Sequence, residues 1–147
     1  MNIVFLFLLI ELSLSYNPKA AIAYAKKYCS NYNTNYNNQS MYGGNESANF
    51  VSQCLVAGGL DFKECVGKKD KGMIVSVSDL RACLDKKGWK KSVGVPKQFI
   101  GGYPFFQGNM HAMIATEVKG TIVTFCGHQN DRCDYNLNQP SYIYYYL

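Results

Sequence analysis

The stretch Gly43–Leu55 constrains this chain more than any other part of its sequence. A Gly43-Gly44 pair indicates a turn, and apolar residues then return at helical spacing from Ser47 to Ala57. Glycines commonly end helices, and Gly58-Gly59 follow directly. The pattern predicts a helix over 47–57 whose N-terminus carries Ser47. Because the first N–H groups of a helix lack partners, a small hydroxyl residue there is a candidate nucleophile.

The 147 residues leave room for one domain and one modest core. Residues 1–15 contain an unbroken apolar run followed by small residues before Tyr16, which is typical of a signal peptide. The run is shorter than the roughly 20 residues that span a bilayer, so we expect cleavage and no membrane span. The expected product is a secreted single domain over 16–147.

The net charge is +5, and loss of Glu11 with the leader would raise it by one. Such a chain can be attracted to anionic surfaces. The lysines are scattered and do not alternate with aromatic residues in a nucleic-acid-binding motif, so we expect no nucleic-acid partner. Ordinary solvent-exposed lysines without a binding role would give the same scattered pattern. We expect a monomer.

Six cysteines in a small exported chain favour disulfides. Their pairing stays open, although the spacing favours Cys126 with Cys133 across a short turn and Cys54 with Cys65. The sequence contains no closely spaced Cys/His set, so we expect neither a metal site nor a cofactor.

The order of the remaining segments predicts an α+β fold in which helices pack on a small antiparallel sheet. Asn17-Pro18 is typical of a helix start, and further helical and strand patterns follow the Asn/Tyr-rich loop 30–42. Predicted helices cover 19–28, 47–57 and 78–88, and predicted strands cover 110–118, 121–126 and 141–147.

Residues 43–53, Gly-Gly-Asn-Glu-Ser-Ala-Asn-Phe-Val-Ser-Gln, and the Tyr-Asn opening at 16–17 resemble the putative amidase domain family, a branch of the papain-like cell-wall hydrolases. The family pattern is Gly-Gly-Asp-Cys-Thr/Ala-Asn-Phe-Val-Ser-Gln, so its nucleophilic cysteine corresponds to Ser47. The serine can be an engineered substitution, an active natural serine or a natural loss of activity. The resemblance implies a papain-like fold. It places Cys54 further down the same helix, buried and without a role as nucleophile.

The chain has two histidines, and both fall in the strand half. The resemblance implies that His111, at a strand start, is the base that takes the proton of the nucleophile; a structural histidine in the sheet is the alternative. Residues 128–132 resemble the His-Thr-Asn-Asp-Arg segment of the family. The group that orients His111 is then His128 or Asn130, because either can accept from the imidazole N–H.

The resemblance therefore implies a secreted papain-like amidase or peptidase with bacterial cell-wall peptides as substrates. In this mechanism residue 47 attacks an amide carbonyl, His111 relays the proton, and His128 or Asn130 orients His111. The alternative is an inactive homologue that binds wall peptides or a protein partner. The sequence also contains two glycosylation sequons, at Asn38 and Asn45.

Overall fold

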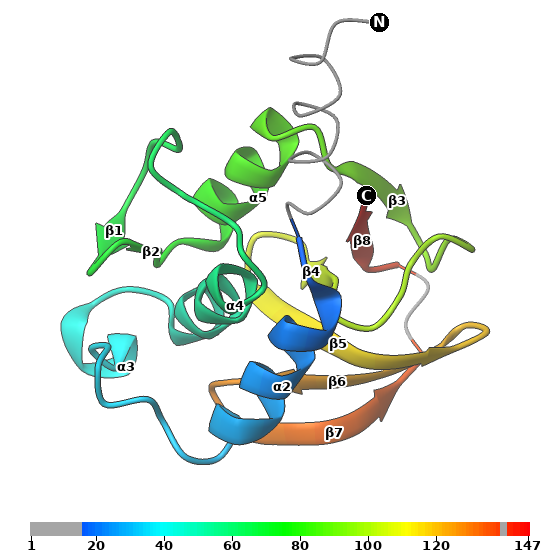
Figure 1. The fold of residues 1–147 in the computed structure, drawn as a ribbon, viewed down its shortest axis with the longest axis horizontal. Helices are drawn as coiled ribbons and strands as arrows, with labels where there is room; N and C mark the ends of the chain where they lie inside the picture. Colours follow the sequence, from blue (N-terminus) through cyan, green and yellow to red (C-terminus); the bar gives the residue numbers. More distant parts are fainter. Residues whose placement is uncertain (1–15, 139–140) are drawn as a thin grey trace, which may run out of the picture.

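The computed structural model describes residues 16–138 and 141–147, so the predicted leader lies outside the described residues. Within them, helices occupy the first half and a sheet fills the second (Figure 1). The helices are α2 (Pro18–Tyr28), α3 (Gln39–Tyr42), α4 (Glu46–Ala57) and α5 (Val77–Lys86). The strands are β1 (Lys69–Asp70), β2 (Met73–Ile74), β3 (Lys90–Val93), β4 (Pro104–Gln107), β5 (His111–Lys119), β6 (Ile122–Gly127), β7 (Arg132–Leu137) and β8 (Ile143–Tyr146).

Six of the strands form one antiparallel sheet in the order β3-β8-β4-β5-β6-β7, and β1 pairs with β2. Helices α2 and α4 pack on the β5–β6 part of this sheet, and α5 packs against α4 (Figure 1). The predicted α+β fold is confirmed. The core lies between helices and sheet, where the fully buried apolar side chains include Phe50, Leu55, Phe105 and Ile114.

Helix α4 begins one residue earlier than the sequence predicts. Asn45 is the N-cap, and its Oδ1 accepts a hydrogen bond from the Ala48 amide. Glu46 is the first helical residue and Ser47 the second. An Asn N-cap satisfies one of the unpaired amides of the first turn, so the cap fixes where the chain enters the helix.

Strand β7 pairs with β6 from Val123 to Gly127, and the sequence patterns do not predict it. Its residues, Arg-Cys-Asp-Tyr-Asn-Leu, lack the apolar alternation of a half-buried strand. It also contains a bulge: Tyr135 pairs with Phe125 and Arg132 with Gly127, so three steps along β7 match two along β6. Asp134 has a φ of 54°, in the left-handed region. A β-bulge of this kind turns side chains to a different face of a strand.

Both disulfide pairings favoured by spacing are wrong. Cys29 at the end of α2 pairs with Cys133 in β7, and Cys65 pairs with Cys83 in α5. The Cα–Cα separations are 5.5 and 5.3 Å, within the range for disulfides. Linear spacing cannot show that the end of α2 lies over β7, because only the packing of the helix on the sheet brings them together. Cys54 and Cys126 are buried free thiols.

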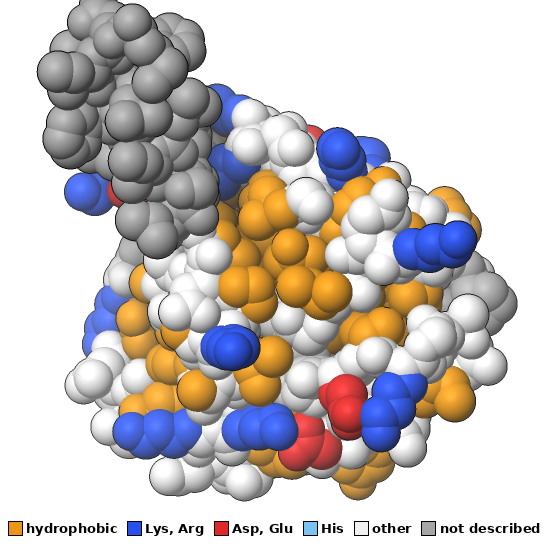
Figure 2. Space-filling model, turned by 45° about the vertical axis from the view of Figure 1, so that its right-hand side comes forward, with side chains coloured by type: hydrophobic (Ala, Val, Ile, Leu, Met, Phe, Trp, Pro, Cys, Tyr) orange, Lys and Arg blue, Asp and Glu red, His pale blue; other side chains and the backbone are white. Residues whose placement is uncertain are grey.

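The described residues include no helix that has both the length and the apolar composition to cross a membrane. Nor do they bring together three or more His, Cys, Asp or Glu side chains that could hold a metal ion. Figure 2 shows one face of the molecule, on which apolar side chains gather near the centre and Lys and Arg side chains are dispersed around them. On this face the positive charge does not form a continuous stripe.

Candidate active site

The hydroxyl of Ser47 is held between α4 and the first residues of β5. Its Oγ donates to Oδ1 of Asn45 at 2.5 Å and accepts the backbone N–H of Ala112 at 3.1 Å. Ser47 is fully buried. The helix N-cap and the sheet thus fix the side chain from both sides, one residue away from His111.

His111 is the first residue of β5 and is partly exposed. Among the described residues its imidazole has no hydrogen-bond partner, so both ring nitrogens are available to a ligand. Burial lowers the pKa of His111, and the nearby positive charge of Arg132 lowers it further. A neutral imidazole is the form that can accept a proton, so this environment suits a general base.

A cavity of about 300 Å³ opens beside His111. The turn between β6 and β7 contributes Asn130 to its wall, and β7 contributes Arg132 and Tyr135. Asn130 is exposed, and its side chain has no hydrogen-bond partner within the described part of the chain. The cavity therefore combines a candidate base, free amide groups and a cation, which are the groups that bind a polar ligand.

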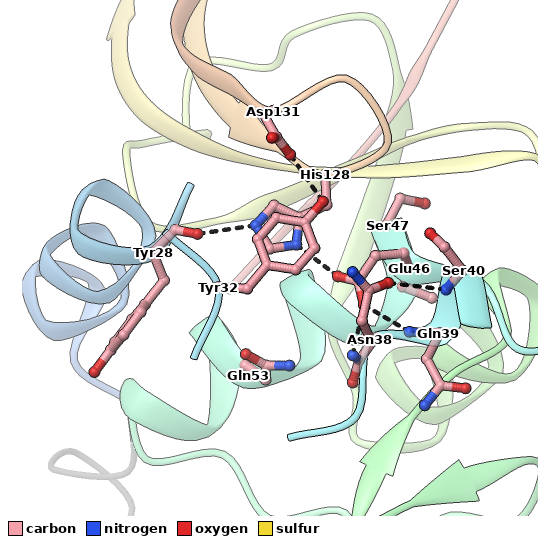
Figure 3. Close-up of polar contacts among 12 residues, drawn as sticks. Tyr28, Tyr32, Asn38, Gln39, Ser40, Glu46, Ser47, Gln53, His128 and Asp131 are labelled. Atoms are coloured by element: carbon pink, nitrogen blue, oxygen red, sulfur yellow. Dashed lines mark hydrogen bonds and ion pairs between the residues drawn. The ribbon is translucent and has the colours of Figure 1, made fainter. Parts of the chain in front are cut away.

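His128 also lines this cavity but is buried, and Figure 3 shows its contacts. Its Nδ1 is 2.5 Å from Glu46 Oε2, and its Nε2 is 2.9 Å from the carbonyl oxygen of Tyr28. The ring stacks between Tyr32 and Phe50, with centroid distances of 4.0 and 3.9 Å. Both ring nitrogens are thus occupied by contacts that do not include His111.

These contacts determine how many protons Glu46 and His128 share. A backbone carbonyl only accepts, so Nε2 carries a proton, and a second proton lies between Nδ1 and the carboxylate. No lone pair remains on the His128 ring to accept from His111. Of the two residues that the sequence offers for orienting His111, His128 has both ring nitrogens engaged, and Asn130 has a side-chain oxygen without a hydrogen-bond partner in the described part of the chain.

The polar side chains of α4 form further hydrogen bonds that hold this helix against its neighbouring segments. The other carboxylate oxygen of Glu46 accepts from the backbone N–H of Gln39 at 3.0 Å (Figure 3). It also accepts from Asn49 Nδ2 at 2.9 Å. Ser52 donates to the Ile74 carbonyl, and Gln53 accepts from Tyr24. These side chains serve helix packing and buried polar support. Glu46 is therefore hydrogen-bonded at both oxygens.

Sequence reasoning missed two contributors to the site. In the sequence, Glu46 stands where the family pattern has Asp, and Arg132 is the last residue of the segment 128–132. The signal for Glu46 was its charge at the start of an otherwise apolar helix, because a buried carboxylate needs a partner. No signal in the sequence could place Arg132, because its direction depends on the bulge in β7.

No curated protein and no solved structure matches this chain. A family model described as putative amidase domain matches residues 15–97, which is more than half of the chain and includes Glu46 and Ser47. His111 and His128 lie beyond the matched segment, so their place beside α4 comes from the fold alone. The chain belongs to the putative amidase domain family, which supports a general amidase-like hydrolytic function.

Proposed function

We propose that this protein is a secreted papain-like amide-bond hydrolase acting on the peptide stems of bacterial peptidoglycan. The observation that supports it is the position of Ser47: the N-terminal turn of α4 holds its hydroxyl against the backbone next to His111. Covalent amide cleavage needs a nucleophile and a base within hydrogen-bond reach, and the contact with Ala112 brings Ser47 to the residue next to His111. The two disulfides are consistent with an oxidising compartment, and the positive charge with an anionic cell wall.

In the proposed reaction, the hydroxyl of Ser47 rotates away from Asn45 and attacks the amide carbonyl. A bond forms between Oγ and the carbonyl carbon, and the proton moves to His111. His111 then protonates the leaving nitrogen as the C–N bond breaks. A water molecule that gives its proton to His111 next attacks the acyl carbon, and His111 returns the proton to Oγ as the bond between Oγ and the acyl carbon breaks. The backbone N–H of Ser47, in the first turn of α4, is the proposed donor to the developing oxyanion.

Asn130 is the proposed orienting residue. Its side chain lines the same cavity as His111 and is free, whereas His128 is held by Glu46 and Tyr28. In this proposal His128 positions the start of α4 through Glu46 and does not contact the reacting groups. Its role is to fix the helix end that carries residue 47.

The second candidate function is a binding protein that holds wall peptides without cleaving them. One observation favours it: the proton of Ser47 is donated to Asn45 and not to His111. A serine has an ordinary pKa far above neutrality and depends on a base for activation. A cysteine at a helix N-terminus becomes much more reactive than a serine there, because its pKa falls into the range where the thiolate forms near neutral pH.

The test compares the chain as written with Ser47→Cys, Ser47→Ala and His111→Gln on purified peptidoglycan, measuring newly formed amine termini. We expect the thiol variant to cleave at least about tenfold faster than the serine form, because a thiolate is the stronger nucleophile at neutral pH. Ser47→Ala and His111→Gln should be inactive. Ser47→Ala is the matched control, because it removes the hydroxyl without adding a thiol.

If Ser47→Cys releases no amine termini, the enzymatic proposal is wrong. Sedimentation of the same proteins with the insoluble wall material then tests the second candidate. A binding protein should cosediment regardless of the residue at position 47. Absence of both cleavage and cosedimentation would reject both candidates.

A further inference from the structure

Arg132 carries a guanidinium without a carboxylate partner in the described part of the chain. The ion pairs there join Lys91 with Asp85, Lys119 with Glu117, and His128 with Glu46. Arg132 instead lies over the ring of Tyr135, with its Cζ 4.6 Å from the ring centroid. It is partly buried, so this positive charge has lost part of its hydration without gaining an anion.

The acidic residues closest to Arg132 in sequence are engaged elsewhere. Asp131 accepts a hydrogen bond from Tyr32 at 2.8 Å, and Asp134 accepts one from Thr116 at 2.8 Å. Both contacts are to neutral hydroxyls on other elements. Two carboxylates thus flank Arg132 in the chain, yet the fold directs each to a different partner.

The bulge in β7 explains the direction of Arg132. In a regular strand, residues three positions apart face opposite sides of the sheet. The extra residue in β7, with Asp134 in the left-handed region, lets Arg132 and Tyr135 share one side and line one cavity. Cys133, between Arg132 and Asp134, is bonded to Cys29 on α2, which anchors the bulged segment.

The cavity beside Arg132 is the one that contains His111. Its remaining polar wall includes the amide side chains of Gln129, Asn130 and Asn136, and it includes no Asp or Glu. A guanidinium with neutral amides around it is a typical environment for a carboxylate, because the planar fork of arginine can donate two parallel hydrogen bonds to it.

We propose that Arg132 binds a carboxylate of the substrate, so that the cleaved amide belongs to an acidic peptide. This inference rests on the proposed function and names the substrate class of the same site. Arg132 is a specificity-determining residue: it selects and aligns the ligand, and Ser47 and His111 perform the bond cleavage. Neutral amides of the same shape lack the group that this cation binds.

Binding of a carboxylate would also change the pKa of His111, the proposed base. The positive charge of Arg132 contributes to the lowered pKa of His111. A bound carboxylate offsets that charge, so the pKa of His111 should rise toward its ordinary value of about 6.5 when an acidic ligand is present. The shift provides a readout of ligand position that does not depend on turnover.

The experiment uses two probes that differ by one charge, N-acetylglutamic acid α-amide and N-acetylglutamine α-amide, each in both enantiomers. Binding to the full-length mature chain is measured by NMR titration, together with the pH titration of the His111 ring. We expect at least one enantiomer of the acidic probe to bind about tenfold more tightly than its neutral counterpart, as a charge-assisted bidentate contact would give. We also expect the pKa of His111 to rise on binding.

Arg132→Gln should abolish the difference between the probes, and Arg132→Lys should keep part of it. The matched control is Lys119→Gln, which removes the same charge from an exposed side chain at the opposite end of β5. It should leave the preference unchanged. If wild-type protein binds both probes equally, or if the control loses the preference as Arg132→Gln does, the inference is wrong.

The wild-type comparison needs no variant, so it decides the matter even if Arg132→Gln fails to fold. Failure of this inference is also separable from failure of the proposed function. Cleavage of acidic and neutral amides at equal rates would overturn the role of Arg132 and leave the hydrolase. Tight binding of the acidic probe without cleavage of any amide would support Arg132 and overturn the hydrolase.

Discussion

Glu46 and His128 form a buried hydrogen bond of 2.5 Å between Oε2 and Nδ1, although 82 positions separate them in the chain. The bond joins the first residue of α4 to the residue that follows β6. Through Nε2 the same imidazole reaches the carbonyl of Tyr28 at the end of α2. One side chain thus fixes three elements around the position that carries Ser47.

Replacement of Glu46 by alanine should strongly destabilise the fold. Alanine removes both carboxylate oxygens, so the buried ring of His128 and the donors of Gln39 and Asn49 lose their partner. Loss of one partner of a buried pair costs about 3–5 kcal/mol of unfolding free energy. Urea unfolding of Glu46→Ala at pH 7 measures this loss.

The control for that measurement is Glu117→Ala. Glu117 pairs with Lys119, but their side chains are 55 and 79% exposed. An exposed pair contributes up to about 1 kcal/mol, so this variant should unfold almost as the parent does. Equal effects of the two variants would show that burial does not govern the Glu46–His128 pair.

The titration of His111 should make the fold less stable in acid. Burial and Arg132 lower the pKa of His111, so the unfolded chain binds a proton more readily than the folded chain. The unfolding free energy should therefore fall as the pH drops below about 6.5 and level off below the pKa of the folded state. His111→Gln should remove this part of the pH dependence. Unfolding curves of both proteins between pH 4 and 8 give the difference, and identical slopes would contradict the expected shift.

Cys54 and Cys126 should resist alkylation in the native protein. Both are buried, and burial raises the pKa of each thiol, so little of the reactive thiolate forms. Iodoacetamide should label no cysteine under native conditions and two in denaturant without reductant. Mass spectrometry of the labelled peptides should identify these two. Rapid native labelling of either thiol would contradict this placement.

The two disulfides should differ in their contribution to stability. Cys29–Cys133 spans a sequence separation of 104 and Cys65–Cys83 one of 18. Cross-linking over a longer loop removes more entropy from the unfolded chain. Cys29→Ser/Cys133→Ser should lower the unfolding free energy by about 2–4 kcal/mol, and Cys65→Ser/Cys83→Ser by less. The reverse order in urea unfolding would show that the loop-entropy account does not hold here.

The two sequons should differ in occupancy. Asn45 donates its side-chain N–H to the Met110 carbonyl and caps α4, so a glycan on this nitrogen would crowd the contact between the helix start and β5. Asn38 uses only its side-chain oxygen, which accepts from the Ser40 amide. Folded protein secreted from a glycosylating host should carry a glycan at Asn38 alone. Glycopeptide mass spectrometry checks this, and Ser40→Ala should abolish the modification.

Local chemistry explains why α2, α4 and α5 could be predicted, whereas the short helix α3 lies inside the predicted loop 30–42 and corrects that prediction. The Asn17-Pro18 start of α2, the glycines after α4 and the spacing of Leu80, Cys83 and Leu84 in α5 act through neighbouring residues, so a short window contains the information. The strands with apolar alternation, β5 and β6, were also found. Strands β3 and β7 were not, because their exposed and polar residues gain their order from pairing partners elsewhere in the chain. The short strands β1, β2 and β4 were missed as well.

The sequence by itself determined the α+β class, the helix that carries residue 47 and the presence of a histidine at the start of β5. Each of these depends on hydrophobic periodicity or on chemistry within a few residues. The tertiary structure alone decided the disulfide pairing, the partner of His128 and the direction of Arg132. These depend on how helices dock on the sheet and on one extra residue in β7, and contacts across 82 or 104 positions leave no local trace in the sequence.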